Sequence, residues 1–230
     1  MNIAKPRRFS FRLSAAARIA LGALALAAGA TGLVSHVMCP SLGPLNECGC
    51  EASRHGWFFE ATPPFKRGLV IDCANSRLTD QDLAREFNRL YRLKPLNLIL
   101  VRSPVSDAGL ATISRLHSLQ ALDISGTNIS DTALEELRSL SNLTKLAVDA
   151  TMLTDRGCES IARVKSLWYL DVRGPGIDEG LIDRLVKLLS EKPTLRNIGL
   201  FDATISFAAK KKIEMQSRLF LASSVRVSEQ

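Results

Sequence analysis

The stretch Leu119-Gln-Ala-Leu122-Asp-Ile124-Ser-Gly-Thr127-Asn-Ile129-Ser-Asp131-Thr-Ala-Leu134-Glu-Glu-Leu137 decides the fold, because the same order of residue types returns every 24 positions. One period forward, the matching residues are Leu143, Leu146, Val148, Leu153, Thr154-Asp155 and Ile161. One period back, they are Leu98, Leu100, Val105, Ser106-Asp107, Leu110 and Ile113. A fixed period of this length is typical of a solenoid, in which each unit buries its apolar face only against its neighbours.

Looser copies of the pattern extend it in both directions. One starts at Leu167, another at Leu195 after four additional residues, and an imperfect copy starts near Ile71. Degraded outer copies are expected, because terminal repeats face water on one side. The sequence therefore predicts about six units over residues 68–218, of which one resembles a cap.

Within each copy the spacing of apolar residues changes from that of a strand to that of a helix. Leu122 and Ile124 alternate as in a half-buried strand, whereas Leu134 and Leu137 have helical spacing. Between them, Ser130-Asp131 stands where a helix N-cap belongs, and equivalent Ser/Thr-Asp pairs precede three other helical parts, at 79–80, 106–107 and 154–155. We therefore expect an α/β fold in which the aspartates of these pairs are caps and not catalytic groups.

The repeated pattern resembles the leucine-rich repeat family, whose consensus is L-x-x-L-x-L-x-x-N/C-x-L. The resemblance covers residues 68–218 and is closest to bacterial-type repeats of 24 residues. It implies a ribonuclease-inhibitor-like solenoid, with a short curved parallel sheet and helices on the convex side. The family's Asn or Cys at the ninth position is absent, so hydroxyl groups or water must satisfy the turn backbone in most units. The residues at that position are Ser76, Ser103, Thr127, Thr151, Pro175 and Ala203.

The N-terminal part of the chain has a different character. Residues 1–18 carry five basic side chains and no acid, and residues 19–38 form a run without Asp, Glu, Lys or Arg. This order is typical of an export signal or a membrane anchor. Cleavage near Ala30 would give a secreted or periplasmic protein, but the uncharged run is just long enough to span a bilayer. We expect residues 19–38 to be a transmembrane helix, with the repeats on the extracytoplasmic side.

This segment also explains the net charge. The formal charge is +7, and residues 1–18 supply five of these charges. The remaining +2 gives no reason to expect a nucleic-acid partner. The basic excess is instead a topology signal that keeps the N-terminus cytoplasmic.

Residues 39–67 form a cysteine-containing cap or linker before the repeats. In an oxidising compartment we expect at least two of Cys39, Cys48, Cys50 and Cys73 to form a disulfide. A zinc site built from Cys39, Cys48, Cys50 and His55 is the alternative, although its C-x-C spacing is tighter than usual. The sequence does not determine which of these cysteines pair in a disulfide.

The sequence contains no recognisable catalytic constellation. It has only three histidines, and the glycines of Arg173-Gly-Pro-Gly176 fit a turn and not a phosphate loop. Cys158 occupies a repeat position held elsewhere by Leu110 and Leu134, so we expect it to be a small buried hydrophobic residue. We expect neither an enzyme nor a bound cofactor or metal.

Candidate binding residues follow from the resemblance, which implies that alternate strand residues point out of the concave side of the sheet. Aspartates would form a stripe there, and Tyr and Arg are residue types that anchor interfaces. Exposed strand residues without any binding role would give the same sequence pattern. The candidates are Asp72, Ile99, Asp123, Tyr169, Asp171, Arg173 and Phe201.

These observations favour a non-enzymatic, membrane-anchored or exported leucine-rich repeat protein that binds another protein through its concave face. The alternative is a structural envelope component that self-associates or is crosslinked through an odd cysteine. Residues 219–230 are expected to form a C-terminal tail.

Overall fold

The structure is a computed structural model that describes residues 42–53, 68–216, 218–222 and 224–227. The basic segment 1–18, the apolar segment 19–38, and Cys39 and His55 of the expected cap lie outside these residues. The expected transmembrane helix therefore stays a prediction, because the described residues do not include it. Among the described residues, no helix has the length and apolarity needed to cross a membrane.

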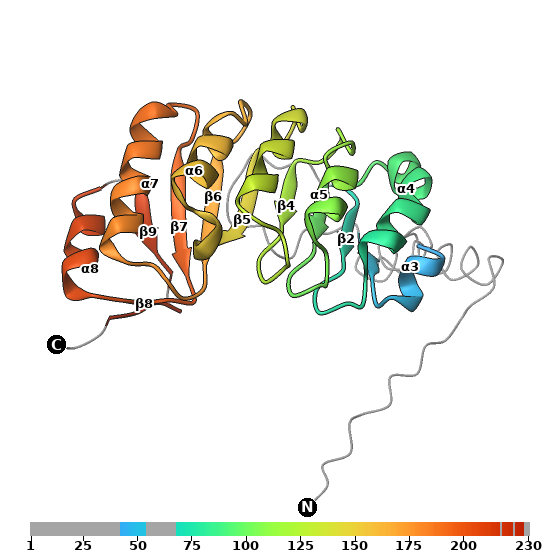
Figure 1. The fold of residues 1–230 in the computed structure, drawn as a ribbon, viewed down its shortest axis with the longest axis horizontal. Helices are drawn as coiled ribbons and strands as arrows, with labels where there is room; N and C mark the ends of the chain where they lie inside the picture. The colour runs from blue at the N-terminus through green and yellow to red at the C-terminus, as the bar shows by residue number, and fades with distance from the viewer. Residues whose placement is uncertain (1–41, 54–67, 217, 223, 228–230) are drawn as a thin grey trace, which may run out of the picture. The chain divides into compact units, whose positions relative to one another are not determined.

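Short strands alternate with helices along the described chain (Figure 1). The strands are β1 (Glu51–Ser53), β2 (Val70–Asp72), β3 (Asn97–Ile99), β4 (Ala121–Asp123), β5 (Lys145–Asp149), β6 (Tyr169–Arg173), β7 (Asn197–Phe201), β8 (Thr204–Ile205), β9 (Leu219–Leu221) and β10 (Arg226–Val227). The α-helices are α3 (Pro44–Glu47), α4 (Asp80–Leu93), α5 (Asp107–Ile113), α6 (Asp155–Ala162), α7 (Glu179–Glu191) and α8 (Phe207–Glu214). Two 3-10 helices are η1 (Thr132–Ser139) and η2 (Ala150–Met152).

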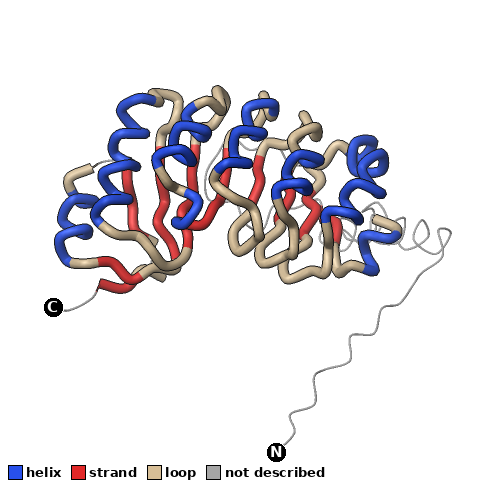
Figure 2. Tube along the Cα trace, in the orientation of Figure 1, coloured by secondary structure: helices blue, strands red, loops and turns tan. Residues whose placement is uncertain are grey.

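The strands form a sheet in the order β1-β2-β3-β4-β5-β6-β7-β9. Only β1 pairs antiparallel with its neighbour, and all the other pairs in this sheet are parallel. A parallel connection needs a crossover segment, and here each crossover contains a helix, so the helices cover one face of the sheet (Figure 2). The expected α/β class with a mostly parallel sheet is confirmed.

The core lies between the sheet and the helices. Equivalent apolar residues of successive strands stand beside one another in the ladder, and each is almost fully buried: Ile71, Leu98, Leu122, Leu146, Leu170 and Ile198. Burial of each such side chain stabilises the fold by about 1.5–3 kcal/mol. From Leu98 to Leu170 the 24-residue period thus sets the register of the sheet, because each repeat returns an apolar residue to the same rung.

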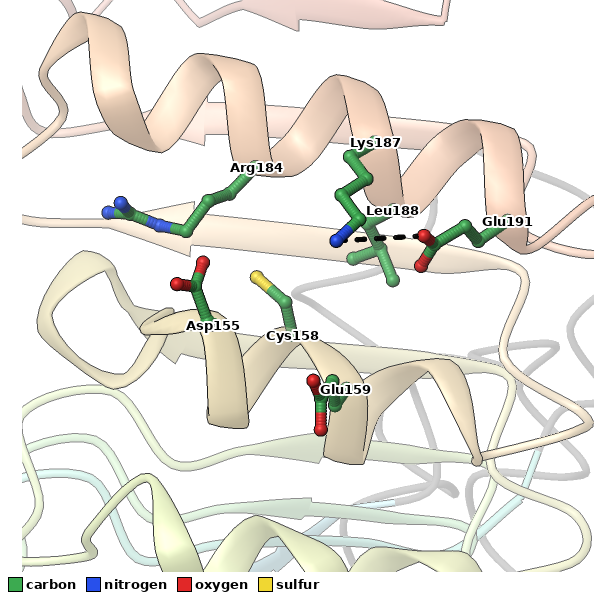
Figure 3. A pocket seen from close by; sticks show the side chains of 7 residues that line it. All are labelled: Asp155, Cys158, Glu159, Arg184, Lys187, Leu188 and Glu191. Carbon is green, nitrogen blue, oxygen red and sulfur yellow. Dashed lines mark ion pairs between the residues drawn. The ribbon is translucent and has the colours of Figure 1, made fainter.

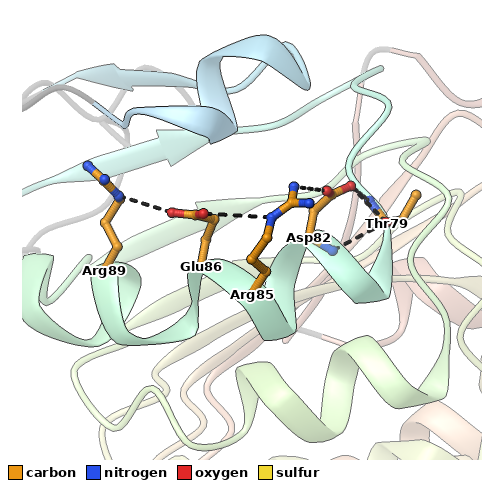
Figure 4. A network of polar contacts seen from close by, with 5 residues as sticks. All are labelled: Thr79, Asp82, Arg85, Glu86 and Arg89. Carbon is orange, nitrogen blue, oxygen red and sulfur yellow. Dashed lines mark hydrogen bonds and ion pairs between the residues drawn. The ribbon is translucent and has the colours of Figure 1, made fainter.

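Helix α4 begins at a capping box. The Thr79 hydroxyl accepts a hydrogen bond from the Asp82 N–H (3.3 Å), and the Asp82 carboxylate accepts one from the Thr79 N–H (3.1 Å). Ion pairs continue along the helix through Arg85, Glu86 and Arg89 (Figure 4). The cap satisfies backbone donors at the start of the helix, whereas the surface ion pairs contribute little.

The aspartates of the Ser/Thr-Asp pairs do not cap their own helices, so that prediction is wrong. In α6 the cap is the hydroxyl of the pair, because Thr154 accepts from the Gly157 N–H. The aspartates of three other pairs, Asp80, Asp107 and Asp131, instead accept hydrogen bonds from the pair of the next repeat, which the repeat brings alongside. We call these contacts the aspartate ladder, and it consists of Asp80 with Ser106, Asp107 with Ser130, and Asp131 with Thr154.

In three of the six units, the hydroxyl group at the ninth position forms a hydrogen bond with a backbone group. The Ser103 hydroxyl donates to the Leu100 carbonyl (2.7 Å), and the Thr127 hydroxyl donates to the Ile124 carbonyl (2.6 Å). The Ser76 hydroxyl accepts from the Leu78 N–H (3.3 Å). Each of these bonds closes the turn between a strand and the following helix.

Candidate functional site: the strand face

The sheet surface opposite the core, here called the strand face, carries the candidate binding residues. Leu98, Leu122 and their equivalents point into the core, so the residues on either side of them point to the strand face. The ladder places one residue of each strand in a central rank on this face. That rank is Asp72, Ile99, Asp123, Ala147, Asp171, Gly199 and Phe220.

Most of the candidate residues are buried, although the sequence led us to expect them to be exposed. Asp123 is 0% exposed and Asp171 is 2% exposed, and Ile99 and Tyr169 are also buried. Asp72 is exposed at the other end of the rank. The expected acidic stripe on the surface is therefore wrong, because two of its three members, Asp123 and Asp171, are buried.

Two cations accompany the buried acids. Arg173, two strands away from Asp123, extends back across β5 to place its guanidinium 3.5 Å from the Asp123 carboxylate. The Lys145 ammonium lies 3.7 Å from the Asp171 carboxylate, and the Ser125 N–H donates to Asp123 (3.0 Å). Buried charges are tolerated only when they are paired, so these four side chains depend on one another.

The ionisation of the group reflects this competition between burial and pairing. Burial raises the pKa of Asp123, and the nearby Arg173 guanidinium partly opposes the rise. Burial also raises the pKa of Asp171, against the attraction of Lys145, and it lowers the pKa of Lys145 itself. These shifts come from the low polarity of the site. They describe a fixed set of ion pairs and do not identify a general acid or base.

An aromatic cluster stands beside the ion pairs at the β9 end of the strand face. The ring of Phe220 lies 5.9 Å from that of Tyr169 and meets that of Phe201 edge-on at 6.3 Å. Lys145 lies 4.2 Å over the Tyr169 ring, and Arg173 lies 5.6 Å over the Phe201 ring. Phe220 is 38% exposed, so the cluster presents an aromatic surface to water.

Gly199 makes room for this cluster in the middle of β7. A Cβ atom at this position would lie 2.6 Å from Phe201, 2.7 Å from Phe220 and 3.0 Å from Asp171. Only glycine leaves the three side chains where they are. The two phenylalanines can therefore meet over the backbone of β7.

The structure brings together Asp123, Tyr169, Asp171, Arg173 and Phe201, and it leaves Asp72 and Ile99 nearer the β1 end. Two members of the site were not singled out from the sequence, namely Lys145 and Phe220. Phe220 lies beyond the expected end of the repeats. The short apolar run Leu219-Phe220-Leu221 is the signal that could have extended them by one strand.

Comparison with known proteins finds similarity among solved structures. No family model and no curated protein matches the chain. The chain is similar to a solved internalin. That structure, from Listeria monocytogenes, matches at 15% identity with a TM-score of 0.30, over 61% of this chain and 52% of the internalin chain. The match thus spans about half of the internalin, and at this level of likeness it says nothing about a partner.

A small hollow between α6 and α7 has acidic, basic and thiol groups around it but does not form a reactive site (Figure 3). Its volume of about 30 Å³ suits a water molecule and little more. Burial raises the pKa of Cys158 to about 11, so its thiol carries almost no thiolate at neutral pH. Lys187 and Glu191 form an ion pair along α7, on one side of the hollow, at 3.8 Å.

The cysteines of the described residues divide into a pair and two free thiols. Cys50 and Cys73 are joined by a disulfide, with their Cα atoms 4.2 Å apart. Cys48 is free and half-buried, and Cys158 is free and buried. The alternative zinc set includes Cys39 and His55, which lie outside the described residues. Within the described part of the chain, no three His, Cys, Asp or Glu side chains are placed to hold a metal ion.

Proposed function

We propose that this chain is a non-enzymatic protein-binding module, in which the aromatic cluster of the strand face contacts another protein. The observation that carries the proposal is the position of Phe220, which is part-exposed and lies against the rings of Tyr169 and Phe201 beside the Arg173 guanidinium. Aromatic and arginine side chains are the usual anchors of protein interfaces.

The ion pairs beneath the cluster support this role by fixing its shape. Arg173 contacts both Asp123 and the Phe201 ring, and Lys145 contacts both Asp171 and the Tyr169 ring. Side chains held in this way lose little further conformational freedom on binding. Such preorganisation lowers the entropic cost of association.

Site-specific photo-crosslinking tests the proposal. A benzophenone amino acid replaces Phe220 in the full chain, within the cells that make the protein, and Tyr91 serves as the control site. Tyr91 is 54% exposed on α4, on the opposite side of the sheet. We expect a discrete crosslinked protein from position 220, lost when Phe201→Ala and Arg173→Ala are added, and none of that species from position 91. The same adduct from both positions would disprove the proposed site.

We further propose that the module acts outside the cytoplasm, anchored by residues 19–38 or exported after cleavage near Ala30. Five basic residues precede an apolar run, an order that directs the following domain across a membrane. The Cys50–Cys73 disulfide supports the same topology, because disulfides persist mainly in oxidising compartments.

A further inference from the structure

The two ends of the sheet are built differently. At one end β1 is antiparallel to β2, begins with the exposed Glu51 and lies next to the Cys50–Cys73 disulfide. At the other end β9 continues the parallel register of the repeats and is composed of Leu219, Phe220 and Leu221. An edge strand without charge or proline is an available template for pairing with another strand.

The hydrogen-bonding groups of β9 are divided between its two sides. The Arg218 carbonyl accepts from the Ile198 N–H, and the Ala222 N–H donates to the Leu200 carbonyl, both at 2.9 Å. In a parallel pair the backbone groups of alternate residues point to opposite sides of the strand, so the N–H and carbonyl groups of Leu219 and Leu221 point away from β7. The Leu219 N–H donates to the Gln216 carbonyl (3.2 Å). The Leu221 N–H and the carbonyls of Leu219 and Leu221 remain on the open side, where no strand of the described residues pairs with them.

Side chains on both faces of this edge are apolar. Phe220 stands on the strand face within the aromatic cluster, and Leu221 packs partly buried against the core. Met215, at the end of α8 just before β9, is among the most exposed apolar side chains of the described residues. A strand added here would cover apolar surface on its two faces as well as pair its backbone.

The charge around the edge selects among the candidate occupants. Residues 202–227 contain five basic side chains and two acidic ones, a net charge of +3, and one of the basic side chains, Lys212, pairs with Glu179 and Asp183 of α7. Lys211 and Arg226 are exposed. A second copy of this chain would bring the same positive charge to the contact, whereas a segment rich in Asp and Glu would be attracted.

We propose that β9 accepts an extended, net-acidic segment of a partner protein as an additional strand, with an apolar residue of that segment placed against Phe220. The proposal rests on the protein-binding function proposed above and names the form of the partner. In this mode the main chain provides affinity, and pockets for alternate side chains provide specificity.

Peptide selection provides the first test. The probe is a library of random peptides displayed on phage and selected on the immobilised full chain. We expect the enriched peptides to be net-acidic, rich in β-branched and aromatic residues, and free of proline in their centre. Enrichment of basic or helix-forming sequences, or no enrichment, would overturn the proposal.

Variants of Leu221 then separate main-chain pairing from side-chain contact. Leu221→Pro removes the outward N–H without removing a bond to β7, and Leu221→Ala keeps that N–H but shortens the side chain. By fluorescence anisotropy of an enriched peptide, we expect Leu221→Pro to weaken binding about tenfold, as for the loss of a hydrogen bond with its neighbouring contacts. We expect Leu221→Ala to weaken it less. A peptide N-methylated at alternate backbone nitrogens should lose binding to the native chain. Circular dichroism establishes that each variant is folded.

Two further variants test the charge argument. Lys211→Glu with Arg226→Glu should weaken binding of the acidic peptide and reduce its salt dependence, whereas Lys187→Glu, exposed on α7 away from the edge, should not. Equal binding by native chain and Leu221→Pro refutes strand addition. A dimer of the full chain that dissociates on Leu221→Pro refutes it in favour of self-pairing. If crosslinking from position 220 succeeds while every peptide arm fails, the strand-face function stands and strand addition is wrong.

Discussion

At the scale of single residues, the sequence located the strand face but not its burial. The period placed Asp123, Asp171 and Arg173 on one face, because it fixes which residues share a rung. It could not show that Arg173 extends across β5 to Asp123, since this contact depends on side-chain length and on the neighbouring Ala147. Sequence alternation reports the direction of a side chain and does not report what covers it.

Arg173 holds down the pKa of a carboxyl group that burial raises. In an Arg173→Gln variant we expect the pKa of Asp123 to rise further, because the largest opposing influence is removed. Below the unfolded pKa both states are protonated. Between the pKa of Asp123 in the unfolded state and its higher pKa in the folded state, the unfolded state releases its proton first. The free energy of unfolding should therefore fall as the pH rises through this range, and it should fall further in the variant. Carboxyl-carbon NMR measures the pKa, and an unchanged titration would contradict the ion pair.

The aspartate ladder gives a second expectation at this scale. Asp107→Ala removes the acceptor of the Ser130 N–H and hydroxyl at an exposed site, so it should lower the free energy of unfolding by about 0.5–1.5 kcal/mol. Asp155→Ala is a matched control, because Asp155 holds the equivalent place in its repeat but has no hydrogen bond to the next one. Urea denaturation measures both variants, and equal losses would argue against the ladder.

Cys158 provides a third expectation. Its thiol is buried and its pKa is raised to about 11, so an alkylating reagent at neutral pH should modify it slowly in the native chain. The half-buried Cys48 should react sooner. Mass spectrometry after brief labelling gives the order of reaction. Modification of Cys158 before Cys48 would contradict the described repeat register.

At the scale of elements, the sequence predicted most helices and the structure corrected the type of one. The segment after Asp131 forms the 3-10 helix η1 and not an α-helix. Leu134, Leu137 and Leu140 are spaced by three residues, and a helix with three residues per turn places all of them on one face. Apolar spacing over so short a segment does not distinguish the two helix types.

The capping box of α4 allows a test of element stability. Thr79→Ala removes the hydroxyl that accepts from the Asp82 N–H, so it should destabilise the protein by about 1 kcal/mol. Thr151→Ala changes the same residue type at an exposed site of η2 and should change stability little. Thermal unfolding of the two variants compares them directly, and a larger loss for Thr151→Ala would count against the capping role.

At the scale of the whole molecule, the repeat period sufficed for the fold class, because a solenoid is determined by contacts between neighbouring units. It did not suffice for the site. The aromatic cluster needs Phe220 from β9, which the consensus did not include, and Gly199, whose importance appears only when two phenylalanines pack over it.

At this scale we also predict on which side of the membrane the repeats lie. The test is a reporter enzyme that works only in an oxidising, extracytoplasmic compartment, fused after Gln230. We expect this fusion to be active, because the basic segment precedes the apolar one. N-terminal sequencing of the mature protein then distinguishes the two alternatives, since a start near Thr31 means cleavage and an intact Met1 means an anchor. A second reporter, one that works only in the cytosol, would exclude both alternatives if it were active at the same position.

The Cys50–Cys73 disulfide also has a mechanical consequence. It lies at the β1 end of the sheet and joins residues 23 positions apart. Tension applied along the chain would pass through the sulfur atoms and bypass the enclosed segment, which withholds roughly 80 Å of extensible contour at about 3.5 Å per residue. When such a molecule is stretched, the repeats towards β9 lengthen while this end stays short, and a reducing agent releases the stored length in a single step.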